Sequence, residues 1–165
     1  MATSTLIQYL ETSQVSGLGV SSAIGPSTSD RSQVETFLAG GSITAGDWVA
    51  FDTSKTGANR VLYVVQAATV AGAGSAGNPL VVGVAKSTVT SGAKVDVVVA
   101  GYVASAYVDA AVVAGSPLCG PFTTAGRADI NVAASTSGLC GVALDADGVA
   151  PLAVNYAPVW VCKKF

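Results

Sequence analysis

The sequence contains no histidine and few charged residues, and both features exclude several classes of function. Its 165 residues include 8 Lys and Arg and 10 Asp and Glu, so 11% are charged and the formal net charge is -2. Without histidine the chain has no Ser-His-Asp or Cys-His centre and no histidine-ligated metal site. Without a basic cluster it has no field for neutralising phosphates. We therefore predict no catalytic residues, no cofactor, no metal and no nucleic-acid partner.

Cysteine is scarce as well. Cys119, Cys140 and Cys162 are odd in number, have no CxxC spacing and lie in apolar segments, which is typical of buried free thiols. A disulfide between two of them stays open as an alternative.

The chain also lacks long apolar runs. Its N-terminus, MATSTLIQYLETS, has no basic region followed by a continuous apolar stretch, as a secretory signal would have. The uncharged run over residues 97–108 is shorter than the roughly 20 residues with which a helix spans a bilayer. We expect no membrane partner and assembly in the cytoplasm of the cell that makes the protein.

What the chain has in abundance is Val, Ala and Gly. Half of its residues are apolar, and from Arg31 onward short Val-, Ile- and Tyr-rich segments alternate with turn residues, which is typical of strands. The predicted strands cover 33–38, 48–52, 60–67, 80–86, 94–103, 106–108, 130–132, 139–143 and 152–161. This pattern predicts an all-β fold with a single small β-barrel or sandwich.

The N-terminal residues differ from the rest. They are rich in Ser, Thr and Gly, with one apolar patch at Leu6, Ile7, Tyr9 and Leu10 and no sustained periodicity. We predict an extended N-terminal arm over residues 1–29 and a β-barrel domain over residues 30–165. Because such an arm can gain order on a partner surface, these four apolar residues are the candidate partner contacts.

An internal repeat is the most informative feature of the sequence. Gly83 and Gly141 lie in similar Gly-Val-Ala segments, and Val103 and Val161 end similar long segments, both 58 residues apart (141 − 83 and 161 − 103). The similar segments, in the same order in both halves, are 43–48 and 112–117, 80–85 and 137–143, and 93–103 and 151–161. We call residues 43–103 the first repeat and residues 112–161 the second repeat. Two such β units, each too small to bury its own apolar face, are expected to pack into one barrel.

Glycine and proline predict local geometry within the repeats. Gly46 and Gly115 lie in tight turns before strands, where a positive φ is expected. Gly83 and Gly141 lie inside strands, which indicates a bulge or the close approach of another backbone. Pro158 is expected to interrupt the pairing of the last strand.

Three short motifs have simpler interpretations than the chemistry they suggest. Residues 72–77 satisfy GxGxxG, but a strand follows where a dinucleotide site needs a helix, so we predict a loop. Asp145 and Asp147 begin a calcium-like loop without its later Gly and Glu, so we predict a turn, with weak cation binding left open. Asp47 and Asp52 are conceivable as a carboxylate pair, but we expect solvated turn positions.

Most aromatic side chains fall inside predicted strands. Packing in the core or at a subunit interface is therefore their expected role, with carbohydrate stacking as a lesser alternative. These residues are Trp48, Tyr63, Tyr102, Tyr107, Tyr156 and Trp160.

Four short segments together resemble the phage capsid decoration (cement) proteins. They comprise an Ala-Gly-Asp turn, a Gly-Val-Ala strand, a long Val-rich strand ending in Gly-Tyr-Val and a second Gly-Val-Ala strand. In this chain they are residues 45–49, 82–85, 97–103 and 140–144. The resemblance covers roughly residues 33 to 161.

The resemblance implies a small β-barrel that forms homotrimers on the outside of an icosahedral shell and clamps the major capsid protein. It implies a structural virion protein, not an enzyme, with residues 1–29 as the arm that binds the capsid. A receptor- or glycan-binding β-module of a phage spike or fibre remains the alternative. A hydrolase on a trimeric β-fold ranks third, because no residue supports it.

Overall fold

The computed structural model describes residues 32–69, 77–121, 123–131, 138–150 and 152–162, which belong, apart from Ser32, to one compact unit, Gln33–Phe165. The predicted arm and its four apolar residues lie outside the described residues, as does most of the predicted 72–77 loop. Within the described ranges, no helix is long and apolar enough to cross a membrane.

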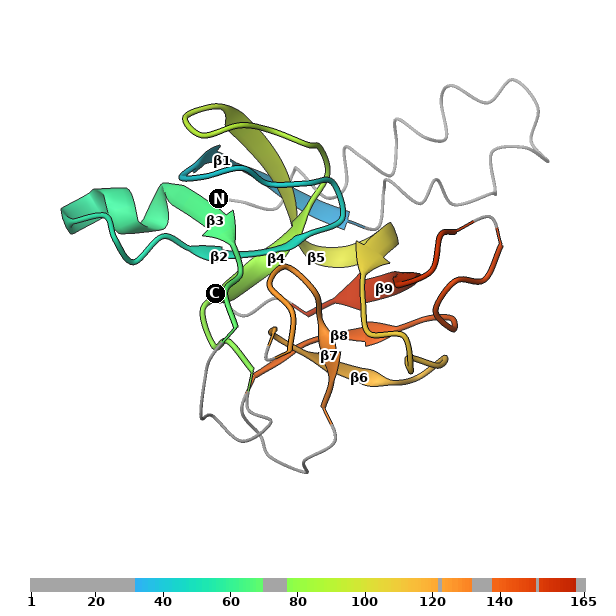
Figure 1. Cartoon of the computed structure of the whole chain (residues 1–165). Helices are drawn as coiled ribbons and strands as arrows, with labels where there is room; N and C mark the ends of the chain where they lie inside the picture. The colour runs from blue at the N-terminus through green and yellow to red at the C-terminus, as the bar shows by residue number, and fades with distance from the viewer. Residues whose placement is uncertain (1–31, 70–76, 122, 132–137, 151, 163–165) are drawn as a thin grey trace, which may run out of the picture. The chain divides into compact units, whose positions relative to one another are not determined.

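The described chain forms nine strands and a short 3-10 helix, η2 (Figure 1). In chain order the elements are β1 Ser32–Ala39, β2 Trp48–Phe51, η2 Gly57–Val61, β3 Tyr63–Gln66, β4 Val81–Ala85, β5 Lys94–Tyr107, β6 Pro117–Cys119, β7 Asp129–Ile130, β8 Leu139–Ala143 and β9 Tyr156–Val161. The predicted all-β fold is confirmed.

The strands form one sheet in the order β1-β3-β2-β4-β5-β9-β8-β6-β7, and β1 also pairs with β5. The β1–β5 pairing closes β1 to β5 into a five-stranded barrel. β5 is long enough to belong to two groups of strands, because its second half pairs with β9. Figure 1 shows β6 to β9 gathered on one side of β5 and β1 to β4 on the other.

The second repeat copies the strand pairing of the first. β2 pairs with β3 and β4, and β6 pairs in the same antiparallel way with β7 and β8. Both copies contain a register shift at the same place, between Val49 and Ala50 in β2 and between Leu118 and Cys119 in β6. The repeat that the sequence indicates is therefore a repeat of structure, including its irregularity.

The barrel closes differently from the expectation. Two units were expected to form one barrel, but the first repeat closes its own barrel with β1, which lies outside the repeat. In the second repeat the end of β5 takes the place of β1, because Val108 forms a parallel bridge to Ala128 beside β7, as Ala39 pairs in parallel with Val64. The two groups of strands thus share β5.

The last strands of the two repeats, β5 and β9, align in the structure with an offset that differs from the 58 residues seen in the sequence. Val84 of β4 faces Val98, and its counterpart Val142 of β8 faces Trp160. Trp160 is therefore the structural counterpart of Val98, four residues beyond the position that the 58-residue offset predicts. Because strand side chains alternate between faces, a shift by an even number of residues leaves the apolar pattern unchanged.

The glycines behave as predicted. Gly46 and Gly115 have φ values of +90° and +84°. A Cβ at Gly83 would overlap the carbonyl oxygen of Val98, and a Cβ at Gly141 would lie 2.7 Å from the carbonyl oxygen of Trp160. Both strand glycines thus allow a neighbouring backbone to approach.

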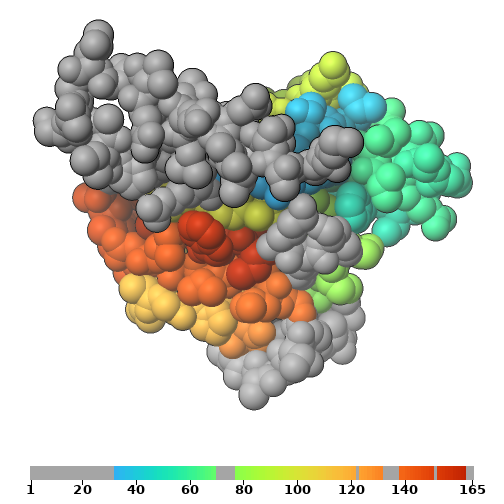
Figure 2. All heavy atoms as spheres, turned by 180° about the vertical axis from the view of Figure 1, so that it is seen from behind, coloured from blue at the N-terminus to red at the C-terminus, as the bar shows by residue number. Residues whose placement is uncertain are grey.

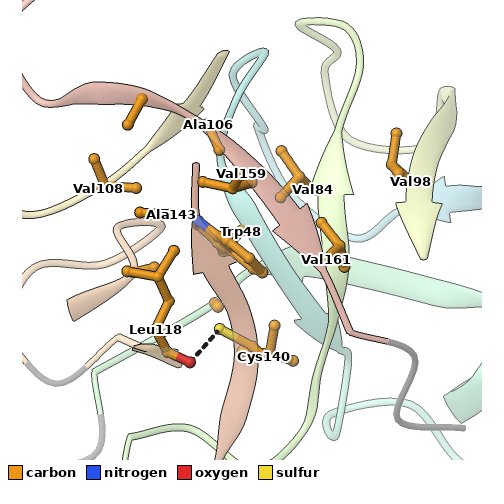
Figure 3. Close-up of a cluster of buried hydrophobic side chains, with 14 of the residues drawn as sticks. Trp48, Val84, Val98, Ala106, Val108, Leu118, Cys140, Ala143, Val159 and Val161 are labelled. Carbon is orange, nitrogen blue, oxygen red and sulfur yellow. Dashed lines mark hydrogen bonds between the residues drawn. The ribbon is translucent and has the colours of Figure 1, made fainter. Parts of the chain in front are cut away.

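The buried side chains form two clusters with matching positions. One fills the barrel of the first repeat and includes Val49, Val82 and Val97, whereas the other includes their counterparts Leu118, Cys140 and Val159. The second cluster also takes in Trp48, Val84 and Val98 from the outside of the first barrel (Figure 3). The second repeat therefore completes its core with side chains of the first.

Several predicted strand bounds are wrong. Residues 57–61 form η2, so the strand predicted from 60 begins at Tyr63, and the strand predicted from 152 begins at Tyr156. The two strands predicted over 94–103 and 106–108 are largely one, β5. β6 is not among the predicted strand ranges, although the repeat placed a strand after the turn at Gly115, because its first residue is Pro117, which in sequence indicates a break.

Pro158 does not interrupt the last strand. It lies inside β9, opposite the register shift between Val103 and Ala106 of β5, where the ladder needs no N–H from it. Its carbonyl oxygen accepts a hydrogen bond from the Leu144 amide at 2.8 Å. The bulge therefore lets proline occupy an internal strand position.

Candidate interaction surface

A row of side chains crosses the outer face of the second repeat. Strand register places Pro117 opposite Val142, Val142 opposite Trp160, and Trp160 opposite Tyr102. Residues directly opposite one another in a sheet point to the same side. These four side chains from β6, β8, β9 and β5 thus form one continuous row, which we call the open row.

The counterpart of this row in the first repeat is buried. Trp48 faces Val84, and Val84 faces Val98, and the three side chains are 0%, 0% and 3% exposed. We call this set the covered row. Both rows are apolar, but they differ in whether another part of the chain packs on them.

The open row remains accessible to solvent. Trp160 is 41% exposed, Pro117 is also exposed, and Val142 and Tyr102 are partly buried. Figure 2 shows the red segment that contains β9 at the surface, between the olive segment of β5 and the orange segment that includes β8. An exposed tryptophan within an apolar row is typical of a surface that binds a partner.

The strands β6, β8 and β9 contribute no charge to this face. β6, β8 and β9 contain no Asp, Glu, Lys or Arg. The polar groups of the open row itself are the Tyr102 hydroxyl and the Trp160 indole N–H. Apolar burial is therefore the main interaction that the row offers to a partner.

Trp48 explains how the covered row became part of the core. Its indole Nε1 donates a hydrogen bond to the Tyr107 carbonyl oxygen at 3.0 Å, and its Cη2 lies 3.0 Å from the position of a Cβ at Gly141. In Figure 3 it lies among Val159, Ala143 and Leu118 of the second cluster. The second repeat thus packs around a side chain that points out of the first barrel.

The two carboxylates considered as a pair are separate and buried, so the expectation of solvated positions is wrong. Asp47 is 3% exposed, and its Oδ2 accepts hydrogen bonds from the Thr44 amide and from Gln66 Nε2, both at 2.9 Å. Asp52 is 6% exposed and accepts hydrogen bonds from the Ser54 amide and hydroxyl. Each carboxylate closes its own turn.

Burial and hydrogen bonding shift these two acids in opposite directions. Burial raises the pKa of Asp47, against the lowering effect of the bonds from Thr44 and Gln66. The hydrogen bond from the Ser54 hydroxyl lowers the pKa of Asp52, with Lys55 contributing. The different partners and opposite shifts fit two structural roles and no shared acid-base pair.

A buried ion pair anchors the loop between β6 and β7. Arg127 Nη2 lies 3.3 Å from Asp129 Oδ1 and 3.2 Å from Asp109 Oδ2, and Thr123 donates hydrogen bonds to Asp129 from its amide and hydroxyl. The side chain of Asp129 is fully buried. This network connects the loop to the residues that follow β5, and sequence reasoning did not identify it.

The remaining candidate acids, Asp145 and Asp147, take part in local hydrogen bonding. The predicted turn is confirmed, because Asp147 and Gly148 lie in a turn in which Gly148 has a φ of +65°. Asp145 Oδ1 accepts a hydrogen bond from the Ala146 amide, and the Asp147 amide donates to the Val112 carbonyl oxygen. Among the described residues, no three His, Cys, Asp or Glu side chains are grouped closely enough to hold a metal ion.

None of the three cysteines forms a disulfide, so the alternative of a disulfide is wrong. Cys119 and Cys140 are buried, as predicted, and their sulfur atoms lie 3.3 Å and 3.4 Å from the carbonyl oxygens of Asp129 and Leu118. Cys162 is only partly buried.

The sequence did not reveal which aromatic residues form the surface. Trp48 and Trp160 both occur in apolar strands, yet one is fully buried and the other is 41% exposed. The repeat indicates which positions to compare, because the covered row and the open row occupy equivalent positions in its two copies. Assigning Trp160 to the open row, however, requires the register of β8 against β9.

No protein-family model and no curated protein matches this chain. Among solved structures, the N base of the head fibre protein gp8.5 of bacteriophage phi29 has a similar fold. The two are 15% identical with a TM-score of 0.51, over 81% of this chain and 97% of the other. The chain therefore shares its fold with the base of a phage head fibre.

Proposed function

We propose that this protein is a structural component of a phage virion that decorates the outer surface of the head by binding the major capsid protein. The observation that carries the proposal is the fold that it shares with the phi29 head fibre base, which covers most of both chains. A phage head fibre is by its name a structural appendage of the head, and the same role fits the chemistry of this surface.

The described side chains support a mechanical role. The buried acids close turns or form the Arg127 network, whereas the accessible feature is an uncharged apolar row. Many copies on a lattice, each adding a modest contact free energy, together stabilise a shell strongly. We assign the capsid contact to the N-terminal arm, residues 1–29, through its patch at residues 6–10.

Particles assembled with and without this protein test the proposal. We expect density on the outer surface of the head only when the protein is present, and lower resistance to heat when it is absent. A protein that is missing from purified particles, or particles with unchanged heat resistance and no external density, would overturn it.

A second candidate is a receptor- or glycan-binding module, which the exposed Trp160 and its cross-strand neighbour Tyr102 favour. Aromatic faces stack on sugars, but sugar sites also use several polar side chains, and the open row has only two polar groups. Deleting residues 1–29 separates the candidates. Decoration predicts loss of head binding, whereas a binding module keeps its attachment to cells or glycans and loses it in Trp160→Ser.

A further inference from the structure

We propose that the connection between β2 and β3 binds a protein partner through a carboxylate that lies beside apolar side chains. We call residues 53–62 of this connection the projection. Its binding residues are Arg60, Val61 and Leu62. This role rests on the proposed function, because the capsid protein is then the partner.

The projection is a second accessible feature of the surface and belongs to the first repeat. Its outer part is η2, which contains no buried residue, and Val61 and Leu62 are 58% and 50% exposed. In Figures 1 and 2 this turquoise segment stands out from the strands of the barrel. Packing in the core therefore does not account for two consecutive large apolar residues at this place.

Local hydrogen bonds connect the parts of the projection. The Lys55 amide donates to the Asp52 carbonyl oxygen at 3.2 Å, and the Leu62 amide donates to the Asn59 carbonyl oxygen at 3.1 Å. Arg60 Nε donates to the Lys55 carbonyl oxygen at 2.8 Å and so ties the side chain to the start of the loop. A segment that is ordered before binding loses less conformational entropy when a partner binds.

The charge of Arg60 is not balanced within the described part of the chain. Its only interaction there is the bond from Nε, which leaves both terminal nitrogen atoms of the guanidinium available. Residues 53–62 contain no acid, and Asp52 pairs with Lys55 at 3.8 Å. Because two N–H groups of a guanidinium match the two oxygen atoms of a carboxylate, Arg60 selects an acidic group on the partner.

The equivalent connection of the second repeat shows the same pairing completed within the chain. The connection between β6 and β7 also contains one arginine, Arg127. Its guanidinium pairs with the carboxylates of Asp129 and Asp109, and only 16% of its side chain is exposed. The first repeat offers its arginine no such acid, so the carboxylate for Arg60 must come from another molecule.

The apolar residues favour a protein over a sugar as the source of that carboxylate. Val61 and Leu62 gain free energy by packing against apolar side chains, which a sugar lacks. An aromatic face for sugar stacking is also not free, because the Lys55 ammonium lies 4.8 Å from the centre of the Tyr63 ring. An acidic and apolar protein surface is therefore complementary to the projection in both charge and polarity.

Binding of the full-length chain to purified heads that lack it tests the proposal. We expect Arg60→Gln, and separately the double variant Val61→Ser with Leu62→Ser, to weaken binding by about tenfold or more. Lys94→Gln is the matched charge control, because Lys94 is exposed and lies outside the projection. Val154→Ser is the matched apolar control, because Val154 is 70% exposed. Both controls should leave binding unchanged.

Two further measurements separate recognition from a change in local structure. Arg60→Lys also loses the bond from Nε but keeps the charge, so its affinity should lie between those of the wild type and Arg60→Gln. Salt should weaken binding of the wild type more steeply than binding of Arg60→Gln. Thermal unfolding confirms that each variant is folded. Equal losses for both Arg60 variants, with the same salt dependence as the wild type, would indicate a structural role and overturn the proposal.

Cross-linking identifies the surface that the projection contacts. With Leu62 replaced by a photo-reactive phenylalanine, illumination of decorated heads should link the chain to a capsid segment that contains Asp or Glu beside apolar residues. A cross-link to a segment without an acid, or no cross-link to the capsid protein, would contradict the proposed recognition.

Failure of this role and failure of the proposed function give different results. A wild-type chain that does not bind heads overturns the proposed function and this role with it. A wild type that binds heads no better than the Arg60 and Val61 variants overturns this role alone and leaves the capsid contact to residues 1–29. Binding to acidic glycans that depends on Arg60, with unchanged binding to heads, would place the carboxylate on a sugar and also contradict the proposal.

Discussion

Ser116 Oγ makes the hydrogen bond in the second repeat that the carboxylate of Asp47 makes in the first. Asp47 Oδ2 accepts from the Thr44 amide at 2.9 Å, and Ser116 Oγ accepts from the Val113 amide at 3.1 Å. The same turn therefore forms with and without a charge. The acid of Asp47 must be explained by its surroundings, since the turn itself does not require it.

The first prediction follows from the raised pKa of Asp47. Because burial raises this pKa above its ordinary value of 3.8, the folded protein binds the proton more tightly than the unfolded chain. The free energy of unfolding contributed by Asp47 therefore falls as pH rises from 3.8 through the folded-state pKa. Asp47→Asn should lose this decline, which urea unfolding at a series of pH values measures.

Asp52 is the control for the sign of this effect. Its pKa is lowered in the folded state, so its contribution to stability is present above pH 3.8 and is lost as pH falls through the folded-state pKa. Asp52→Asn should therefore remove a dependence of the opposite direction. Identical pH profiles for the wild type and Asp47→Asn would contradict the prediction.

The second prediction concerns the strand glycines. An alanine at Gly83 meets the carbonyl of Val98, and one at Gly141 meets the carbonyl of Trp160, so each should destabilise the fold by about 1–3 kcal/mol or more. Gly41→Ala is the control, because nothing lies within 4 Å of its Cβ position. Guanidinium unfolding measures the free energy of unfolding of all three variants. Equal values for them would refute the close approach of a neighbouring backbone at Gly83 and Gly141.

The third prediction separates the two partners of Arg127. Asp129 is fully buried, whereas 28% of the Asp109 side chain is exposed. Asp129→Asn should destabilise the protein by about 3–5 kcal/mol, because it breaks a buried pair. Asp109→Asn should cost less than about 1 kcal/mol. Chemical unfolding of both variants measures the two losses in the free energy of unfolding. A larger loss for Asp109→Asn than for Asp129→Asn would contradict the geometry.

The fourth prediction concerns the accessibility of the three thiols. Cys162 is partly accessible, whereas Cys119 and Cys140 are buried, so the native protein should label rapidly at one cysteine and the unfolded protein at all three. Mass spectrometry after timed alkylation counts the labels, and Cys162→Ser should abolish the rapid label. Rapid labelling at Cys119 or Cys140 would contradict the burial of these two thiols in the native protein.

Much of the fold could be predicted from alternating apolar residues and turn residues. The strand over residues 139–143 was predicted to the residue, because its sequence has glycine and turn residues on both sides and a clear apolar pattern. β6 was given no bounds, although a strand was expected after the turn at Gly115, since three residues beginning with Pro117 carry too little pattern to define one. Its pairing with β7 and β8 creates it.

The long-range contacts could not be predicted. The Arg127–Asp129 pair is close in sequence, but its burial and its link to Asp109 depend on how the loop after β6 returns to β5. The offset of the last strand is a similar case. Val103 and Val161 look equivalent in sequence, yet hydrogen bonding to β8 makes Trp160 the counterpart of Val98, and the apolar alternation is the same for both offsets.

The sequence by itself determined that the chain is an all-β protein with two related halves, because the apolar period and the repeated turns are local properties. Only the tertiary structure decided which apolar face is covered. The covered row with Trp48 and the open row with Trp160 are both apolar in sequence, and burial depends on whether another surface packs against a face. In this chain the second repeat packs on the first, and its own outer row remains accessible.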